Sequence, residues 1–240
     1  LGETNLTAVD QATDSPTNNF CTINPLNNYY QNGTFSEGNN YLVSSSGGYA
    51  FSTSTMGMAT GKWYWETKVV NIGAGEYQLF GITGDPCTGT LNWLGLNPYG
   101  WGIYNHAGGD TVLKNNNGDV WTDGATYTTG DILGCALDLD NNKLYFSKND
   151  TYFNSGVPTS GATGTGAASV TAAASTTFGF YIPAFGQLSA LVSTWGANFG
   201  GSPAFTVSSG NADENGYGNF EYAPPSGYYA LCTKNLAEFG

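Results

Sequence analysis

Two stretches of alternating side chains constrain the fold of this chain more than any other feature. Residues 61–70 (GKWYWETKVV) place aromatic and branched residues at every second position, and residues 137–150 (LDLDNNKLYFSKND) hold two apolar runs around a polar turn. A period of two is typical of strands with one buried face, because successive side chains point to opposite faces of a sheet. Both stretches therefore favour an all-β chain in which two sheets pack together.

The composition agrees with a chain of many strands and turns. Apolar residues make up 40% of the 240 residues and aromatic residues 15%, which is enough for a substantial core. Charged residues reach only 10%, so Asn, Ser, Thr and Gly must supply the polar surface. Helices favour Glu, Lys, Leu and Ala, and no helix of convincing length is expected.

The charge balance excludes several classes of function. The net charge is −12, with six lysines and no arginine. Binding to nucleic acid or to an anionic membrane surface requires a basic footprint, which this chain lacks. It also has no run of 18 apolar residues, so membrane insertion is not expected.

The chain divides into a short polar lead-in and one large domain. Residues 1–19 contain Pro16 and follow no regular period, which indicates an extended N-terminal linker or arm. From residue 20 to 240, short alternating runs are separated by clusters of Gly, Asn, Asp and Ser. This pattern predicts a single two-sheet antiparallel β-sandwich.

Turn residues between the runs predict four hairpins and two long connections. The four pairs are residues 41–43 with 49–51, 62–71 with 76–83, 100–104 with 111–114, and 132–138 with 143–147. Residues 154–175 and 204–225 exceed the usual connection length. We interpret the first as a functional or mobile surface loop and the second as a polar excursion.

The four cysteines do not indicate a metal site. Cys21, Cys87, Cys135 and Cys232 are widely spaced and form no C-x-x-C pair, so zinc is not expected. Cys135 lies in an apolar strand and is expected to be buried, and Cys87 reads as an unpaired thiol in a loop. Two alternatives stay open for Cys21 and Cys232, namely a disulfide between the ends of the domain or two buried free thiols.

One segment combines aromatic rings with amide groups. Residues 93–106 (WLGLNPYGWGIYNH) contain the only histidine of the chain. Aromatic faces stack on sugar rings and Asn amides bond hydroxyls, so the segment suits a neutral glycan. The surface candidates for binding a glycan or partner are Trp93, Tyr99, Tyr104 and His106. The alternative is that this strand only supplies Trp101 and Ile103 to the core, as Trp63 and Trp65 are expected to do from theirs.

Catalytic and metal sites find weaker support. His106 has no nucleophile motif near it. A glycosidase needs two facing carboxylates, whereas Glu66 stands alone in its strand. Asp110, Asp119 and Asp123, with Asn117, form a run of oxygen donors that suits calcium but lacks the EF-hand spacing; a solvated hairpin tip is the alternative. No metal and no cofactor are therefore expected.

Several motifs, taken in order, resemble those of SPRY domains. They are residues 61–66 (GKWYWE), 80–82 (FGI), 130–140 (GDILGCALDLD), 144–149 (LYFSKN), 181–184 (YIPA) and 195–200 (WGANFG). The resemblance covers roughly residues 41–200 and implies a bent, concanavalin A-like sandwich of the jelly-roll type. The peptide-binding residues of animal SPRY domains do not correspond one by one to positions here, so the resemblance assigns no site residue.

The flanking segments resemble the borders of SPRY-like modules in structural proteins of marine tailed phages, including cyanophages. These segments are residues 24–26 (NPL) and 224–236 (PPSGYYALCTKNL), and they extend the resemblance to roughly residues 14–236. This second resemblance implies a component of a phage virion, located on the tail, a fibre or the capsid surface and therefore extracellular.

The leading hypothesis is a non-enzymatic structural or adhesion module of a virion. Its expected partners are other virion proteins, further copies of itself, and a host-surface glycan or protein contacted through loops on the rigid sandwich. Two alternatives stay open. One is a glycan hydrolase on the same scaffold, which would depend on Glu66. The other is a purely architectural subunit that assembles with itself into a shell or filament.

Overall fold

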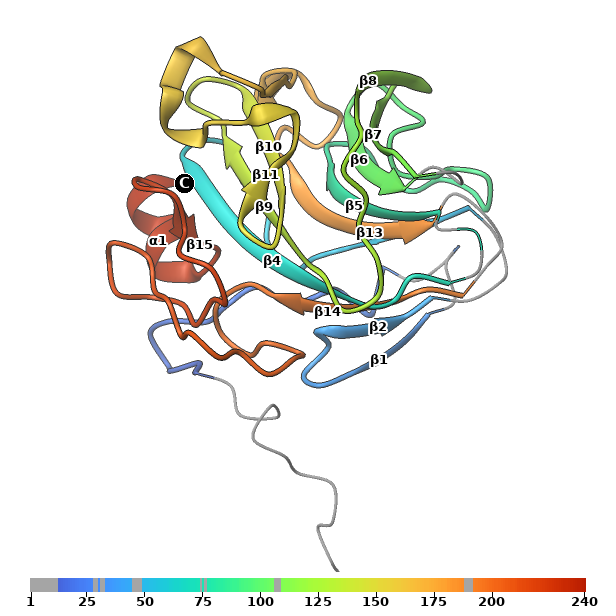
Figure 1. Ribbon diagram of the computed structural model, residues 1–240. Coiled ribbons are helices and arrows are strands. Elements are labelled where there is room, and N and C mark those ends of the chain that lie inside the picture. Colours follow the sequence, from blue (N-terminus) through green and yellow to red (C-terminus); the bar gives the residue numbers. More distant parts are fainter. Residues whose placement is uncertain are drawn as a thin grey trace, which may run out of the picture.

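The strands of this chain form a sandwich of two sheets. The computed structural model describes residues 13–27, 30, 33–44, 49–73, 75, 77–105, 109–187 and 192–240. Within these ranges the strands form one sheet of nine and one of six, which face each other as two layers (Figure 1). The predicted all-β, two-sheet sandwich is confirmed. The helices of the described ranges are all too short or too polar to cross a membrane.

The nine-stranded sheet is built around the long strand β4. Its strands, in spatial order, are β1 (Thr34–Ser36), β2 (Tyr41–Val43), β14 (Thr194–Asn198), β4 (Lys62–Asn71), β9 (Ile132–Asp138), β10 (Lys143–Lys148) and β11 (Thr151–Tyr152). Two short strands lie off this path: β12 (Ala168–Ser169) pairs with β10, and β15 (Tyr229–Ala230) pairs with β4. Neighbouring strands are antiparallel except that β15 runs parallel to β4.

The six-stranded sheet is antiparallel throughout. Its strands, in spatial order, are β3 (Phe51–Thr53), β13 (Ile182–Gln187), β5 (Gln78–Thr83), β6 (Gly100–Asn105), β7 (Thr111–Asn115) and β8 (Gly118–Asp123). Short helices lie outside the sheets: the 3₁₀ turns η2 (Phe153–Ser155), η3 (Pro158–Thr163) and η4 (Ala173–Ser175), and the helix α1 (Thr233–Phe239).

Aromatic side chains fill the space between the sheets. Trp63 and Trp65 of β4 are fully buried there, which confirms that they belong to the core. The Phe80 ring of β5 lies near the centre, 6.5 Å from the Trp65 ring and 6.1 Å from the Trp195 ring between centroids. Burial of each such side chain stabilises the fold by about 1.5–3 kcal/mol. Every second residue of the strands thus holds the two layers together.

Two of the four predicted hairpins are confirmed and two are wrong. β6 pairs with β7 and β9 pairs with β10, as predicted. By contrast, β4 and β5 lie in different sheets, and so do β2 and β3. Both members of each wrong pair bury one face in the same core, but from opposite sides. Alternation alone does not distinguish two strands paired in one sheet from two strands that face each other across the sandwich.

The two ends of the domain meet without a disulfide. Phe20 and Cys232 form an antiparallel bridge, and the Cys21 N–H donates to Leu231 O over 2.9 Å. Cys21 points into the core between the sheets, whereas Cys232 belongs to a cluster on the outer face of the nine-stranded sheet. Because the two side chains point to opposite sides, both thiols are free, and the alternative of two buried thiols describes the structure.

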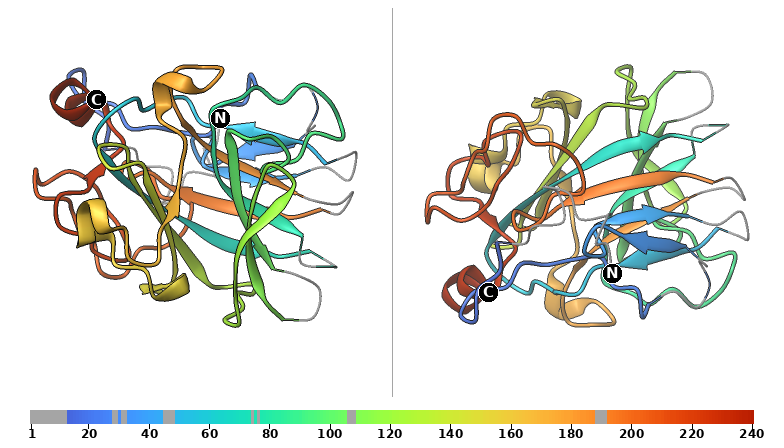
Figure 2. Two further views of the ribbon diagram at one scale, coloured as in Figure 1. Left: turned by 90° about the horizontal axis from the view of Figure 1, so that it is seen from above. Right: turned by 90° about the horizontal axis from the view of Figure 1, so that it is seen from below.

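Chain segments outside the strands cover the outer face of the nine-stranded sheet. The views in Figure 2 place η3 and the C-terminal stretch at the same end of the sandwich, and the Tyr228 hydroxyl donates to Pro158 O over 3.0 Å. The region interpreted as a surface loop, 154–175, buries Ala168, Val170 and Ala173 in the core. Residues 13–19, assigned from sequence to the N-terminal arm, turn against the C-terminal part, where Thr13 Oγ1 donates to Gly201 O over 3.0 Å.

Candidate functional site

The outer face of the six-stranded sheet carries its own apolar cluster. In β5, β6 and β7, the core residues alternate with Leu79, Tyr104 and Val112, which point outward. These side chains form one cluster with Phe51 of β3 and Ala184 of β13. The outer face of the six-stranded sheet therefore has an apolar cluster separate from the core between the sheets.

The connection from β5 to β6, residues 84–99, folds back over this cluster. Leu94 is fully buried, and a side chain at Gly102 in the sheet below would meet its Cγ atom at 3.1 Å. A glycine at position 102 therefore lets the connection approach the sheet closely. Three residues before Leu94, Leu91 is 68% exposed.

Aromatic rings are partly open to solvent beside this connection. Tyr77 stacks on Tyr104 with 6.1 Å between ring centroids, and Trp93 packs half-buried against the same cluster. Lys114 Nζ lies 5.7 Å from the centroid of the Tyr104 ring and pairs with Asp119. Burial raises the pKa of the Tyr104 hydroxyl, with the neighbouring Lys114 charge acting in the opposite direction. We call Tyr77, Trp93 and Tyr104, together with Leu91 two positions before Trp93 in the chain, the aromatic surface.

The structure brings together two of the four residues suggested from sequence. Trp93 and Tyr104 meet in the aromatic surface, although Tyr104 is only 4% exposed. Tyr99 lies elsewhere, at the point where its carbonyl accepts a hydrogen bond from Gly84 N. His106 lies outside the described residues.

The alternative interpretation of the same segment also holds, because Trp101 and Ile103 are buried in the core. Sequence reasoning missed Tyr77 and Leu91. Tyr77 lies two positions before Leu79 and shares its alternation, so the sheet register would have identified it.

The acidic residues considered for calcium do not converge. Asp119 pairs with Lys114, and Asp123 accepts hydrogen bonds from Ala125 N over 2.8 Å and Asn154 N over 2.6 Å. Asp110 is exposed and immediately precedes β7. In the part of the chain that the structure describes, no three acidic, Cys or His side chains are placed to hold a metal ion.

Glu66, on which the hydrolase alternative depended, is sealed on the opposite side of the molecule. Its carboxylate is fully buried and accepts four hydrogen bonds. The donors are the Tyr64 hydroxyl (3.0 Å), Asn198 Nδ2 (3.3 Å), Glu221 N (2.9 Å) and Tyr222 N (2.8 Å). Burial raises the pKa of Glu66 to about 7, and the four donors oppose that rise. A carboxylate enclosed in this way anchors the C-terminal stretch and has no room for a glycan.

Comparison with known proteins identifies the domain. Residues 62–179 match the SPRY domain family. Ran-binding protein 9 of Homo sapiens is 32% identical over 92 residues, which are 38% of this chain and 12% of that protein. The Ran-binding proteins 9/10 homolog of Drosophila melanogaster is 31% identical over 91 residues, 37% of this chain and 9% of that protein. The matches thus span only a small part of these relatives' length.

Solved structures show the same fold. The SPRY domain of human HERC1 superposes with a TM-score of 0.53 and 19% identity, covering 73% of this chain and 96% of that domain. The TRIM65 PSpry domain superposes with a TM-score of 0.52 and 15% identity, covering 74% of this chain and 90% of that chain. The superpositions show that the two packed sheets have the fold of a SPRY domain, and the family match identifies residues 62–179 of this chain as such a domain, a protein–protein interaction module.

Proposed function

We propose that this chain is a non-enzymatic interaction module that docks a protein partner on the aromatic surface. The observation that carries the proposal is that the half-buried Tyr77 and Trp93 rings pack on one cluster of the six-stranded sheet, while Leu91, two positions before Trp93, is 68% exposed. Tyrosine and tryptophan dominate the binding energy of many interfaces, because they bury a large area at a low cost in side-chain entropy.

The character of the surface supports a protein partner. The rings are held in place by stacking and by the sheet below, so docking requires little reordering of side chains. The ion pair of Lys114 and Asp119 lies at its border and supplies a polar rim. A SPRY domain at residues 62–179 agrees with this assignment, since such domains bind proteins.

The experiment compares variants in a pull-down from an extract of the source cells or particles. The double variant Leu91→Asp with Trp93→Ala should lose at least about tenfold of the partner retained by the unaltered chain. Val157→Asp serves as the control, because Val157 is 43% exposed and precedes Pro158, whose carbonyl bonds to Tyr228 on the nine-stranded side. Equal retention of partner by all three proteins would refute the proposal.

The place of the module on a phage virion is a finer proposal. It depends on the resemblance of residues 24–26 and 224–236 to the borders of phage modules. On that basis we propose an extracellular position on the tail, fibre or capsid surface, with self-association or contact to other virion proteins. Antibody labelling of particles by electron microscopy would test the position, and light scattering of the isolated chain would test self-association. Unlabelled particles would exclude the virion surface.

A neutral glycan is the second candidate ligand. Trp93 and Tyr77 offer partly open ring faces of the kind that stack on sugars, whereas Tyr104 is too buried to contribute. Calorimetric titration with neutral oligosaccharides separates the two candidates. Saturable heat that disappears in Trp93→Ala supports the glycan, and its absence together with partner capture supports the protein.

A further inference from the structure

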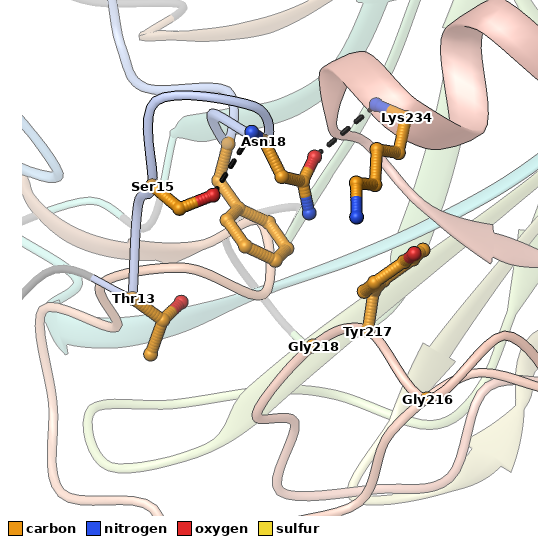
Figure 3. A pocket seen from close by; sticks show the side chains of 8 residues that line it. Thr13, Ser15, Asn18, Gly216, Tyr217, Gly218 and Lys234 are labelled. Atoms are coloured by element: carbon orange, nitrogen blue, oxygen red, sulfur yellow. Dashed lines mark hydrogen bonds between the residues drawn. The ribbon is translucent and has the colours of Figure 1, made fainter.

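A pocket of about 290 Å³ lies where three distant segments of the chain meet, away from the aromatic surface (Figure 3). One wall comes from the N-terminal stretch, one from the turn at 216–218, and one from helix α1. The lining residues are Thr13, Ser15, Asn18, Phe20, Gly216, Tyr217, Gly218 and Lys234. Its size suits a single amino-acid residue or sugar ring rather than a long ligand.

Lys234 projects into this pocket and forms no ion pair with any carboxylate of the described ranges. Lys234 Nζ lies 5.4 Å from the centroid of the Tyr217 ring, beside the space of the pocket (Figure 3). Among the described residues, the ion pairs within 4.0 Å join Lys62 to Asp138 and Lys114 to Asp119, and none includes Lys234. In a chain with six lysines and 18 acidic residues, an unpaired ammonium group over a ring is available to a ligand anion.

A buried amide lies next to this ammonium group. Asn18 is only 6% exposed, and its Oδ1 accepts hydrogen bonds from Lys234 N over 3.1 Å and from the Thr233 hydroxyl over 3.4 Å. These bonds fix the oxygen against α1 and leave the Nδ2 group on the side of Lys234 Nζ (Figure 3). The Asn18 amide also contacts the Cys232 thiol, which is only a weak acceptor. Two donors therefore lie side by side in the pocket.

The rest of the pocket has apolar walls and an open floor. The rings of Phe20 and Tyr217 line it, and Gly216 has open space where a side chain would begin. At Gly218, with φ +107°, a side chain would lie 2.5 Å from the Phe220 ring, so this floor position must remain bare.

Two aspartates accept hydrogen bonds from main-chain N–H groups of lining residues without lining the pocket themselves. Asp14 Oδ1 accepts from Phe20 N over 2.8 Å. Asp213 is buried and accepts from Tyr217 N, Asn215 N, Ala230 N and Asn235 Nδ2. Neither aspartate lines the pocket, so its charged lining group is the ammonium of Lys234.

We propose that this pocket binds the carboxylate of a peptide C-terminus that ends in an apolar side chain. Lys234 Nζ and Asn18 Nδ2 would donate to the carboxylate, and the Phe20 and Tyr217 rings would contact the last side chain. One cation matches one carboxylate, whereas the net charge of −12 repels polyanionic ligands. The proposal does not depend on the aromatic surface, which lies on the other sheet.

The test is an NMR titration of the full chain with N-acetyl-Gly-Leu as the free acid and as its C-terminal amide. We expect the acid to shift the resonances of Tyr217 and Lys234 with saturation at millimolar concentration, and the amide to bind at least about tenfold more weakly. Lys234→Met should lower the affinity for the free-acid peptide at least about tenfold. A higher salt concentration should also lower this affinity.

Controls keep the result specific to the pocket. Lys68→Met is the matched variant, because Lys68 Nζ also lies over a ring, that of Phe205 at 6.0 Å, outside the pocket lining. It should bind the acid as the unaltered chain does, and so should Trp93→Ala, which separates this proposal from the proposed function. Equal binding of acid and amide, no shifts up to about 20 mM acid, or stronger binding of glucuronate would overturn the proposal.

Discussion

The outer faces of the two sheets differ in how they are covered. On the nine-stranded sheet, the outward side chains of β4 are sealed by the C-terminal stretch, which bonds to Glu66 through the main chain of residues 221 and 222. The Tyr64 and Phe220 rings meet edge to face there, 5.2 Å apart between centroids. On the six-stranded sheet, residues 84–99 leave half-buried rings and an exposed Leu91 at the surface.

This difference bears on which outer face can be covered by a second molecule. Main-chain hydrogen bonds to a buried carboxylate must be satisfied in the folded state, because opening them leaves buried polar groups without partners. Half-buried rings have no hydrogen bonds that must be kept in this way. They become further buried when a second molecule covers them. We therefore propose that the part of the nine-stranded face around Glu66 has a structural role and that the six-stranded face docks the protein partner.

The largest expected effect is the loss of the Glu66 anchor. In Glu66→Ala, two main-chain N–H groups, the Asn198 amide and the Tyr64 hydroxyl lose their acceptor in a buried site. We expect the free energy of unfolding to fall by about 3–5 kcal/mol. Urea unfolding followed by circular dichroism measures this change.

Two control variants sharpen that measurement. Glu221→Ala removes a carboxylate that is largely solvated and bonds Ser208, and Trp93→Ala removes a half-buried ring from the aromatic surface. Each should lower the free energy of unfolding by about 1 kcal/mol. If Glu66→Ala matched these values, the nine-stranded face would not be held by this carboxylate.

A smaller effect is expected from pH. Burial raises the pKa of Glu66 from 4.5 to about 7 in the folded chain, so between these values the folded state holds a proton that the unfolded state has released. The contribution to stability is therefore complete below pH 4.5 and is lost as pH rises through about 7. Compared with Glu66→Gln, the unaltered chain should lose on the order of 3 kcal/mol over this range.

Other groups near Glu66 make the comparison with Glu66→Gln necessary. Tyr64, Tyr152, Tyr222 and Glu221 are ionisable and lie around it, and the tyrosines have pKa values raised by burial. These groups are present in both proteins, so the difference between the two curves of stability against pH isolates Glu66. Parallel curves would show that Glu66 does not titrate in this range, and an opposite slope would show that its four donors outweigh burial.

The sequence was sufficient for the fold class and for the residues that fill the core. The alternation around Trp63, Trp65, Trp101 and Ile103 identified buried faces correctly, because a period of two depends only on neighbouring residues. The pairing of β4 and β5 was predicted wrongly, since it depends on which layer each strand enters.

The sites were harder to predict because they depend on contacts between distant residues. Glu66 looked isolated, yet its main-chain donors lie 155 and 156 positions later in the chain. The aromatic surface likewise needs the sheet register that brings Tyr77 beside Tyr104 and the fold of residues 84–99 that brings Trp93 to them. No pattern among neighbouring residues predicts these contacts between distant parts of the chain.

The most direct test of this account is photo-crosslinking from the two faces in the presence of native partners. A photoreactive amino acid placed at Leu91 reports on the six-stranded side, and one placed at Val157 reports on the other side; both native side chains are exposed. The account predicts a discrete crosslinked partner from position 91 that is lost when Trp93→Ala is added, and none from position 157. The same partner crosslinked from position 157 alone would contradict it.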